Sequence, residues 1–270
     1  MDILSFAREI FEGEKIEYVS ALPLSSCEIV RPYLLQRAGI GDEGTVIMLA
    51  VPYFAADSEA RNLSLYAVSG DYHLYFSELF GRVLPQFREK FSGHIFEGFS
   101  DHSPIAEIGA AAMSGIGVIG KNHMLITEKY SSYVFLGEII CDIKADIPTG
   151  KIKECEMCGA CERACPVGLD MDKCLSALSQ KKGSLSLEEE EKLISLGSVW
   201  GCDICQSVCP HSAEASETKI EFFHQKRLPF IKTDTIENMS EEDFSSRAYS
   251  WRGKDVILRN LKIFGSGNER

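Results

Sequence analysis

Apolar residues recur at helical spacing in several separate stretches of the chain. Residues 1–13 and 71–91 both show this period, which predicts two helices in the first part of the protein. Pro85 falls inside the second stretch and is expected to kink or divide that helix. Further helices are predicted at residues 107–114, which are rich in alanine, at the acidic residues 185–196, and at residues 255–263.

Two continuous apolar runs predict strands. Residues 45–51 are apolar without interruption up to Pro52, a pattern typical of a strand that is buried on both faces. Residues 133–140 form the second run, in which Gly137 indicates a bulge or the close approach of another group. Together with the helices, these strands predict one mixed α/β (α+β) domain at residues 1–150.

A glycine-rich stretch follows the predicted helix at residues 107–114. Gly115, Gly117 and Gly120 have the G-x-G-x-x-G spacing of dinucleotide-binding loops, which need a strand before them and a helix after them. Helix-forming alanines precede the motif here, so the dinucleotide interpretation is disfavoured. We instead expect a glycine-lined wall that allows the backbone to approach a flat cofactor.

The chain after residue 150 is rich in cysteine, which predicts a second domain of a different kind. Eight of the ten lie between residues 155 and 209, in a C-x2-C-x2-C-x3-C-P block, a shorter C-x2-C-x3-C-P block and one position between them. Bacterial ferredoxins use the first spacing to bind a 4Fe-4S cluster with three thiolates and lend the fourth to a second cluster. Residues 151–225 are therefore expected to form a ferredoxin-like domain with two 4Fe-4S clusters, followed by a tail at residues 226–270.

The ferredoxin arrangement assigns four thiolates to each cluster. The first cluster is expected to use Cys155, Cys158, Cys161 and Cys209, and the second Cys202, Cys205, Cys165 and Cys174. Structural zinc sites and disulfides are the alternatives for a cysteine-rich segment. Neither explains this run of eight cysteines, and the remaining two, Cys27 and Cys141, are expected to be ordinary buried thiols.

Composition and charge limit the expected size of the domains, the expected binding partners and the expected cellular location. The 270 residues, 45% of them hydrophobic, suffice for a full core and a small second module. The formal net charge of -12 disfavours general affinity for nucleic acid, although a local basic patch is compatible with it. No signal peptide and no apolar run of membrane length is visible, so we expect a cytoplasmic protein without membrane association, where thiols stay reduced.

Several motifs taken together resemble the epoxyqueuosine reductase family. They match in order from about Ile47 to Ser212 and comprise residues 69–73, 101–107, 115–122, 135–138, the first cysteine block and residues 201–210. The family carries a cobalamin and two 4Fe-4S clusters, and it reduces the epoxide of epoxyqueuosine in tRNA to the alkene of queuosine. The resemblance therefore implies a cobalamin-binding domain ahead of the ferredoxin-like domain.

The resemblance also implies roles for individual residues. Asp101 matches the family's proton donor, a role that requires its pKa to be raised in a water-poor site. From turn chemistry alone, Asp101 would only cap the turn before Pro104. The residues expected to contact cobalamin are Tyr72, His73, Asp101, Ser103, Lys121, Asn122, Leu136, Gly137 and Asp203. His73 could be an axial cobalt ligand, but the family's base-off cobalamin favours a hydrogen-bonding pocket residue.

The implied partners are tRNA, through its anticodon loop, and an electron donor such as a flavodoxin or ferredoxin; we expect a monomer. This chain departs from the family pattern at His102, Ser103 and Ile108. Longer members continue into a helical-repeat domain that helps to hold tRNA, so we interpret this chain as a short member with a truncated tail. That tail is locally rich in Lys and Arg, which leaves a reduced tRNA footprint open.

Two other functions remain open from the sequence. The same cofactors could serve the reduction of a small molecule, as in related reductive dehalogenases, which predicts turnover without RNA. A non-enzymatic electron carrier would bind two clusters and no corrinoid. Cobalamin binding separates the carrier from the two enzymes, and salt-sensitive tRNA affinity separates the enzymes from each other.

Overall fold

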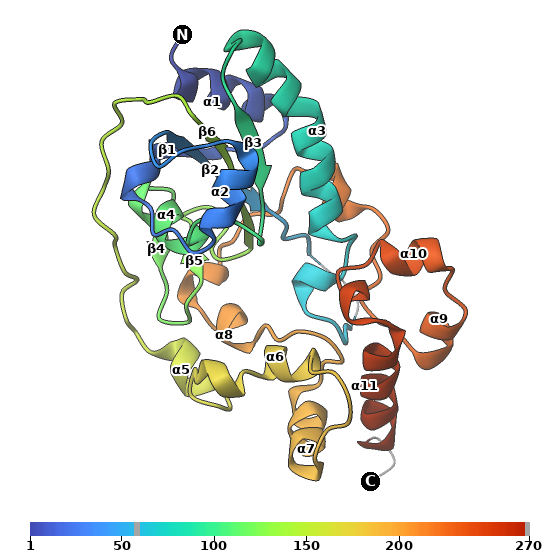
Figure 1. Ribbon diagram of the computed structural model, residues 1–270. Helices are drawn as coiled ribbons and strands as arrows, with labels where there is room; N and C mark the ends of the chain where they lie inside the picture. The colour runs from blue at the N-terminus through green and yellow to red at the C-terminus, as the bar shows by residue number, and fades with distance from the viewer. Residues whose placement is uncertain (57–59, 268–270) are drawn as a thin grey trace. The chain divides into compact units, whose positions relative to one another are not determined.

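The computed structural model describes residues 1–56 and 60–267 and divides into two compact units (Figure 1). The first unit consists of Met1–Tyr53, Tyr75–Cys158 and Glu214–Ile220. The second consists of Phe54–Leu74, Gly159–Ala213 and the chain from Glu221 onward. Each unit is thus assembled from separated segments, and the three-part division expected along the sequence stays a prediction.

The first unit is built on an antiparallel sheet of four strands in the order β1-β2-β6-β3. Its strands are β1 (Tyr18–Pro23), β2 (Thr45–Pro52), β3 (Phe96–Phe99) and β6 (Val134–Cys141), and β4 (Val118–Ile119) pairs separately with β5 (Leu125–Ile126). Its helices are α1 (Ile3–Gly13), α2 (Pro32–Ala38), α4 (Glu107–Met113) and most of α3 (Tyr72–Lys90). The mixed α/β class expected from the sequence is confirmed.

Strand β2 lies in the middle of this core, and every one of its residues is buried, as its continuous apolar run predicted. Because side chains alternate between the faces of a strand, Val46, Met48 and Ala50 share one face. They belong to a core cluster with Ala110 and Ala111 of α4. Helix α4 therefore packs on this face of the sheet.

Helices α1 and α3 follow the predicted apolar periods. In α1, Asp2 caps the first turn by accepting a hydrogen bond from the Ser5 backbone N–H at 2.9 Å, and Phe11 is fully buried. The ring of Phe11 packs against Phe87 of α3, with 6.3 Å between centroids. Pro85 lies within α3 but does not divide it, so that part of the prediction is wrong.

Gly137 on β6 shows the close approach expected from the sequence. The β6 register with β2 runs through the pair Gly137 and Leu49 without a bulge. A Cβ atom at Gly137 would lie 2.3 Å from Cε1 of Phe76 in α3. The position therefore excludes a side chain because α3 packs closely against this face of the sheet.

We expect Gly137→Ala to lower the free energy of unfolding by about 1–3 kcal/mol, because the added methyl group forces Phe76 or the backbone to move. Gly109→Ala is the control: this glycine lies inside α4, and its added Cβ would meet nothing within 4 Å. The control is expected to gain about 0.5–1 kcal/mol from helix propensity. Thermal unfolding of both variants measures the difference, and equal stabilities would contradict the packing argument.

The glycine-rich stretch forms the β4–β5 hairpin instead of a dinucleotide-binding loop. Helix α4 precedes it and strand β4 begins within it, the reverse of the strand-then-helix context that a dinucleotide motif requires. A Cβ at Gly117 would lie 2.4 Å from the carbonyl oxygen of Ile126. The close approach of the hairpin strands explains this glycine, while the predicted wall against a flat cofactor stays a prediction.

The second unit is mainly helical and has its own core. Its helices are α5 (Ala160–Ala164), α6 (Leu175–Ser179), α7 (Leu187–Leu196), α8 (Ile204–Ser207), α9 (Thr233–Glu237), α10 (Glu241–Ser245) and α11 (Lys254–Gly267). Trp200 is fully buried beside Tyr249, and its indole N–H donates to the Tyr66 hydroxyl at 2.8 Å. Helices α7 and α11 confirm the two late helices predicted from the sequence.

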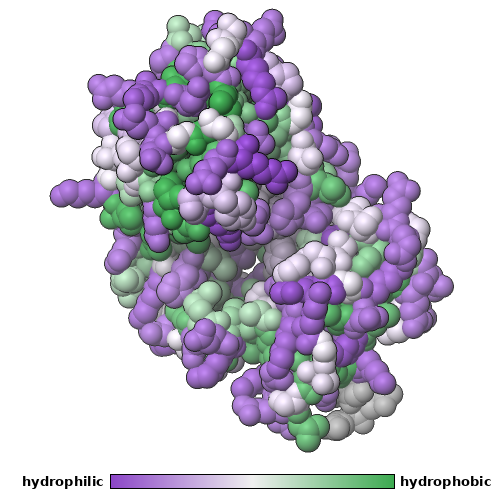
Figure 2. All heavy atoms as spheres, in the orientation of Figure 1, coloured by the Kyte–Doolittle hydropathy of each residue, from purple (hydrophilic) through white to green (hydrophobic). Residues whose placement is uncertain are grey.

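The visible surface is largely hydrophilic, in keeping with the 25% of charged residues in the chain (Figure 2). Among residues 1–56 and 60–267, no helix combines the length and the apolar character that a membrane crossing requires.

Candidate functional site

Five cysteines of the second unit lie close enough to interact. Cys202 and Cys205 flank the start of α8, and the charges of Cys202, Cys165, Cys174 and Cys161 act on Cys205. Burial first, and then these neighbouring thiolates, raise the pKa of Cys205 to about 12. The structure thus gathers the four residues that the sequence assigned to the second cluster together with Cys161, which it assigned to the first, and the assignment of ligands to each cluster stays a prediction.

The chemistry of this thiol group suits an iron–sulfur cluster. All ten cysteines of the chain are free thiols. Among the described residues, no three His, Cys, Asp or Glu side chains converge on one point as the ligands of a single ion. The thiolates of a 4Fe-4S cluster bind four different iron atoms, so they lie around a larger centre than the ligands of a single ion.

The first cysteine block begins next to the β4–β5 hairpin of the first unit. Cys155 donates its backbone N–H to the Ile119 carbonyl at 2.9 Å, and its sulfur accepts the backbone N–H of Lys121 at 3.3 Å. Such N–H···S bonds stabilise thiolate charge and are one determinant of cluster potentials. Of the remaining predicted ligands, Cys158 belongs to the first unit, and Cys161 and Cys209 to the second.

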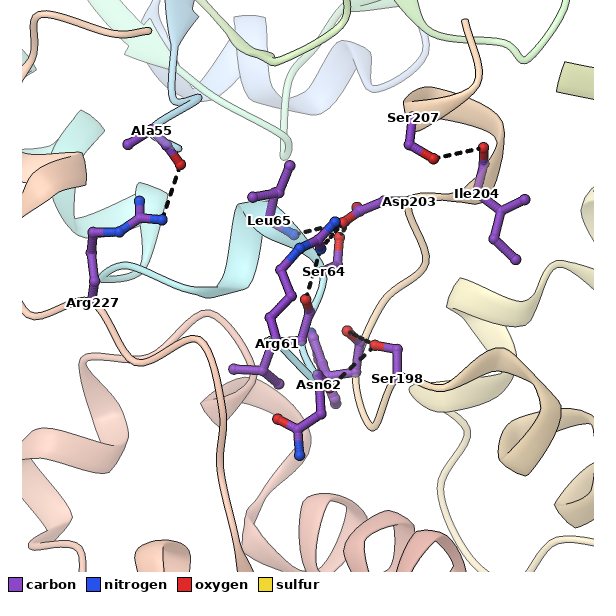
Figure 3. A network of polar contacts seen from close by, with 12 residues as sticks. Ala55, Arg61, Asn62, Ser64, Leu65, Ser198, Asp203, Ile204, Ser207 and Arg227 are labelled. Carbon is purple, nitrogen blue, oxygen red and sulfur yellow. Dashed lines mark hydrogen bonds and ion pairs between the residues drawn. The ribbon is translucent and has the colours of Figure 1, made fainter. Parts of the chain in front are cut away.

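Asp203 anchors the loop that carries Cys202 and Cys205 (Figure 3). Its side chain is only 8% exposed and accepts the Leu65 backbone N–H at 2.9 Å, together with the Ser64 hydroxyl and the Arg61 guanidinium. Three donors therefore occupy the carboxylate that the sequence assigned to cobalamin contact, and that assignment stays a prediction. Arg61 and Ser64 were missed because nothing local links them to a residue about 140 positions later.

We expect Asp203→Asn to loosen this loop, because an amide cannot accept from all three donors and leaves the Arg61 charge without its counterion. The free energy of unfolding should fall by about 1–3 kcal/mol, the usual cost of an unsatisfied buried group. Asp234→Asn, an exposed position of α9 in the same unit, is the matched control. Faster loss of iron to a chelator in Asp203→Asn alone is the expected result, and equal rates would contradict the anchoring role.

Tyr72 and His73 lie at the start of α3. Their rings stack with 4.1 Å between centroids, and His73 Nδ1 lies 2.8 Å from the Asp71 carboxylate. Asp71 also accepts the His73 backbone N–H at 3.0 Å. One imidazole nitrogen is therefore held by a carboxylate, an arrangement that both a pocket residue and a metal ligand can have, so the role of His73 stays a prediction.

Asp101 lies on an exposed loop directly after β3. Its backbone is left-handed, with φ of 62°, a conformation that Asp tolerates better than most residues. Its backbone N–H donates to Oε1 of Glu107 at 3.1 Å. The loop therefore presents the Asp101 side chain at the surface while a second carboxylate holds its backbone.

Ser103 turns inward from the same loop and is fully buried. Its hydroxyl donates to Oε1 of Glu138 and accepts the backbone N–H of Ile105 at 3.1 Å. Its carbonyl accepts from the guanidinium of Arg31 at 2.9 Å. The Ser103 hydroxyl thus forms its hydrogen bonds inside the protein, and its contact with cobalamin stays a prediction.

Glu138 is the acidic residue that the sequence interpretation did not assign to the site. It lies on β6, shares a face with Leu136 and Ile140, and is fully buried. Burial, followed by the charge of Glu107, raises its pKa well above the ordinary range, and burial also raises the pKa of Glu107, to about 7. A lone acid on the core face of an apolar strand was the available signal.

The other predicted contacts in the first unit have structural surroundings of their own. Lys121 and Asn122 form the β4–β5 turn, in which Asn122 is buried and its side-chain oxygen accepts the Met124 backbone N–H at 3.4 Å. Leu136 packs on the core cluster beside α4. Contacts of these residues with cobalamin stay predictions.

Comparison with known proteins finds curated relatives that are named as reductases. It is 32% identical over 200 residues to the epoxyqueuosine reductase of Lactococcus garvieae (strain Lg2), an alignment covering 67% of this chain and 55% of that protein. The chain belongs to the epoxyqueuosine reductase family, and it spans little more than half the length of this relative. No protein-family model matches it.

Solved structures agree with this relationship at the level of the fold. The epoxyqueuosine reductase of Streptococcus thermophilus superimposes with a TM-score of 0.81 at 22% identity, covering 100% of this chain and 82% of that one. An epoxyqueuosine reductase crystallised with an epoxyqueuosine-modified tRNA stem loop gives a TM-score of 0.76 at 22% identity, covering 98% and 82%. The mixed α/β architecture is therefore shared with these reductases.

Proposed function

We propose that this protein reduces epoxyqueuosine to queuosine in tRNA, with base-off cobalamin and two 4Fe-4S clusters as cofactors and Asp101 as the proton donor. The observation that carries the proposal is the gathering of Cys165, Cys174, Cys202 and Cys205 in a chain of the epoxyqueuosine reductase family. A tRNA substrate is supported by the related reductase that was crystallised with a modified stem loop.

The chain's residues would hold these cofactors in distinct ways. When bound, the clusters would relay single electrons, and the corrinoid would supply the reduced cobalt that cleaves carbon–oxygen bonds. The eight cysteines of the two blocks would provide the thiolates for the clusters. The Lys121 N–H would stabilise charge on the Cys155 sulfur, and Asp203 would fix the loop of Cys202 and Cys205.

Asp101 would supply a proton to the oxygen that leaves. Conversion of an epoxide to an alkene breaks two carbon–oxygen bonds, consumes two electrons and two protons, and releases water. A carboxyl group can donate near neutral pH only where a water-poor surrounding raises its pKa. The exposed Asp101 loop would acquire that surrounding when substrate and cofactor cover it.

An RNA footprint in the tail would be small. Arg247 and Arg259 donate to backbone carbonyls of the second unit, so their side chains serve its structure. Trp251 is 58% exposed, and the Arg252 guanidinium lies 3.8 Å from its ring centroid. An exposed aromatic ring beside a cation can stack an unpaired base and contact phosphate, which fits an anticodon loop.

The decisive experiment is turnover by the anaerobically reconstituted protein. With cobalamin, a flavodoxin or ferredoxin as electron donor, and tRNA carrying epoxyqueuosine, mass spectrometry of the nucleosides should show queuosine. Two clusters without corrinoid binding would favour an electron carrier instead. Reduction of small epoxides or halides without RNA, combined with no salt-dependent tRNA affinity, would favour the small-molecule reductase.

A further inference from the structure

One oxygen of the buried Glu138 carboxyl lacks a hydrogen-bond donor. Its Oε1 accepts from the Ser103 hydroxyl, whereas its Oε2 is buried without a partner. A buried carboxylate oxygen left without a donor is costly, and native proteins avoid this arrangement unless the group has a particular role. Glu138 is therefore unlike an ordinary structural acid.

The side chain that meets Glu138 is another carboxyl. Glu107, on the first turn of α4, lies within hydrogen-bonding reach of Glu138. Two carboxyl groups can hydrogen-bond only if one of them carries a proton. A pair of carboxyls that shares a site keeps a proton to a higher pH than either acid does alone.

The groups around the pair leave it short of positive charge. Asp101 and the Cys27 thiol lie close enough for their charges to interact with Glu107 and Glu138, respectively. Arg31 is the positive group that acts on Glu107, and its guanidinium also donates to the Ser103 carbonyl. One cation among three carboxyls favours retention of a proton by the buried pair.

The pair is tied directly to the loop of the proposed proton donor. Glu107 Oε1 accepts the backbone N–H of Asp101 at 3.1 Å, and Ser103 of the same loop donates to Glu138. The two acids thus hold both ends of the segment from Asp101 to Ser103. A left-handed Asp101 needs such fixed neighbours to keep its orientation.

We propose that Glu107 and Glu138 share one proton at neutral pH, and that this pair positions the Asp101 loop and reprotonates Asp101 during turnover. The second part rests on the proposed function. Asp101 gives the first proton to the epoxide oxygen and receives the shared proton through Glu107. It then gives the second proton, so that the oxygen leaves as water while the external donor supplies both electrons. The partly exposed Glu107 regains a proton from solvent.

The shared proton can be tested without any activity assay. Infrared spectra of the full-length protein at pH 7 should contain the C=O stretch of a protonated carboxyl that shifts in D2O. The band should disappear in the double variant Glu107→Gln, Glu138→Gln and persist in Glu97→Gln, a half-buried acid on β3 of the same sheet. A wild-type spectrum without this band would overturn the shared proton.

Stability against pH provides a second readout. A carboxyl whose pKa is raised by folding keeps its proton in the folded protein while the unfolded chain loses it, so its stabilising effect declines as the pH rises. From pH 5 to pH 8, the double variant should therefore gain melting temperature relative to wild type, whereas Glu97→Gln should show a constant difference. A constant difference for the double variant as well would count against the proton-sharing pair.

Reprotonation is tested by Glu107→Gln alone in the reconstituted enzyme. The amide oxygen can still accept the Asp101 N–H, but the side chain can no longer deliver a proton. We expect the single-turnover rate to fall about tenfold or more, and the decline of the wild-type rate with rising pH to flatten. A wild-type rate and pH profile in this variant would overturn reprotonation. If wild type itself does not act on tRNA, the proposed function fails while the infrared result still decides the pair.

Discussion

Asp101→Asn should retain its iron and corrinoid content but lose about 10²–10⁴-fold in turnover, the usual contribution of a positioned general acid. The amide keeps the size of the side chain and tolerates the left-handed backbone at this position at least as well as Asp does. The backbone N–H that donates to Glu107 is also unchanged. The substitution therefore removes the acidic proton with little effect on the loop.

Single-turnover conversion of epoxyqueuosine-containing tRNA, read by mass spectrometry of the nucleosides, measures this effect. Asp42→Asn is the matched control, since Asp42 is an exposed aspartate of the same unit outside the carboxyl cluster. It should turn over like wild type. If Asp101→Asn also did so, the proton would have to come from another group.

Local patterns were sufficient for β2, β6, α1, α3 and α4 of the first unit, whereas β1, β3, α2 and the β4–β5 pair were not predicted. The apolar run at residues 45–51 became the fully buried β2, and the periodic stretch at residues 71–91 became α3. Pro85 does not divide α3, whereas the kink expected there stays a prediction. The sheet order was beyond reach, because the pairing of β6 with β2 and β3 joins segments far apart in the sequence.

In the candidate site, too, some residues could be predicted from local sequence and others could not. Cysteine spacing identified the thiols that the second unit gathers, and turn chemistry located the Asp101 loop. The links from Asp203 to Arg61 and from Ser103 to Glu138 depend on tertiary packing, so no local signal announces them. The residues predicted to bind cofactors follow short motifs, whereas the residues that hold them in place come from elsewhere in the chain.

Replacing one cysteine of the gathered group tests the cluster assignment most directly. In Cys205→Ala, three thiolates remain for the second cluster, and anaerobic iron content should fall from about eight to about four atoms per chain. Electrons would then have no complete second cluster through which to pass, so turnover should fall to background. Without a cluster, the neighbouring thiolates only repel one another, so their proximity would not stabilise the protein.

Cys27→Ala is the matched control, because Cys27 is a partly buried thiol of the first unit whose sulfur lies 3.8 Å from the Pro23 carbonyl oxygen. It should retain about eight irons. Iron and acid-labile sulfide analysis, together with electron paramagnetic resonance of the reduced protein, distinguishes loss of one cluster from loss of both. If Cys205→Ala kept the iron content of the control, Cys205 would not be a ligand, and another residue would have to complete the second cluster.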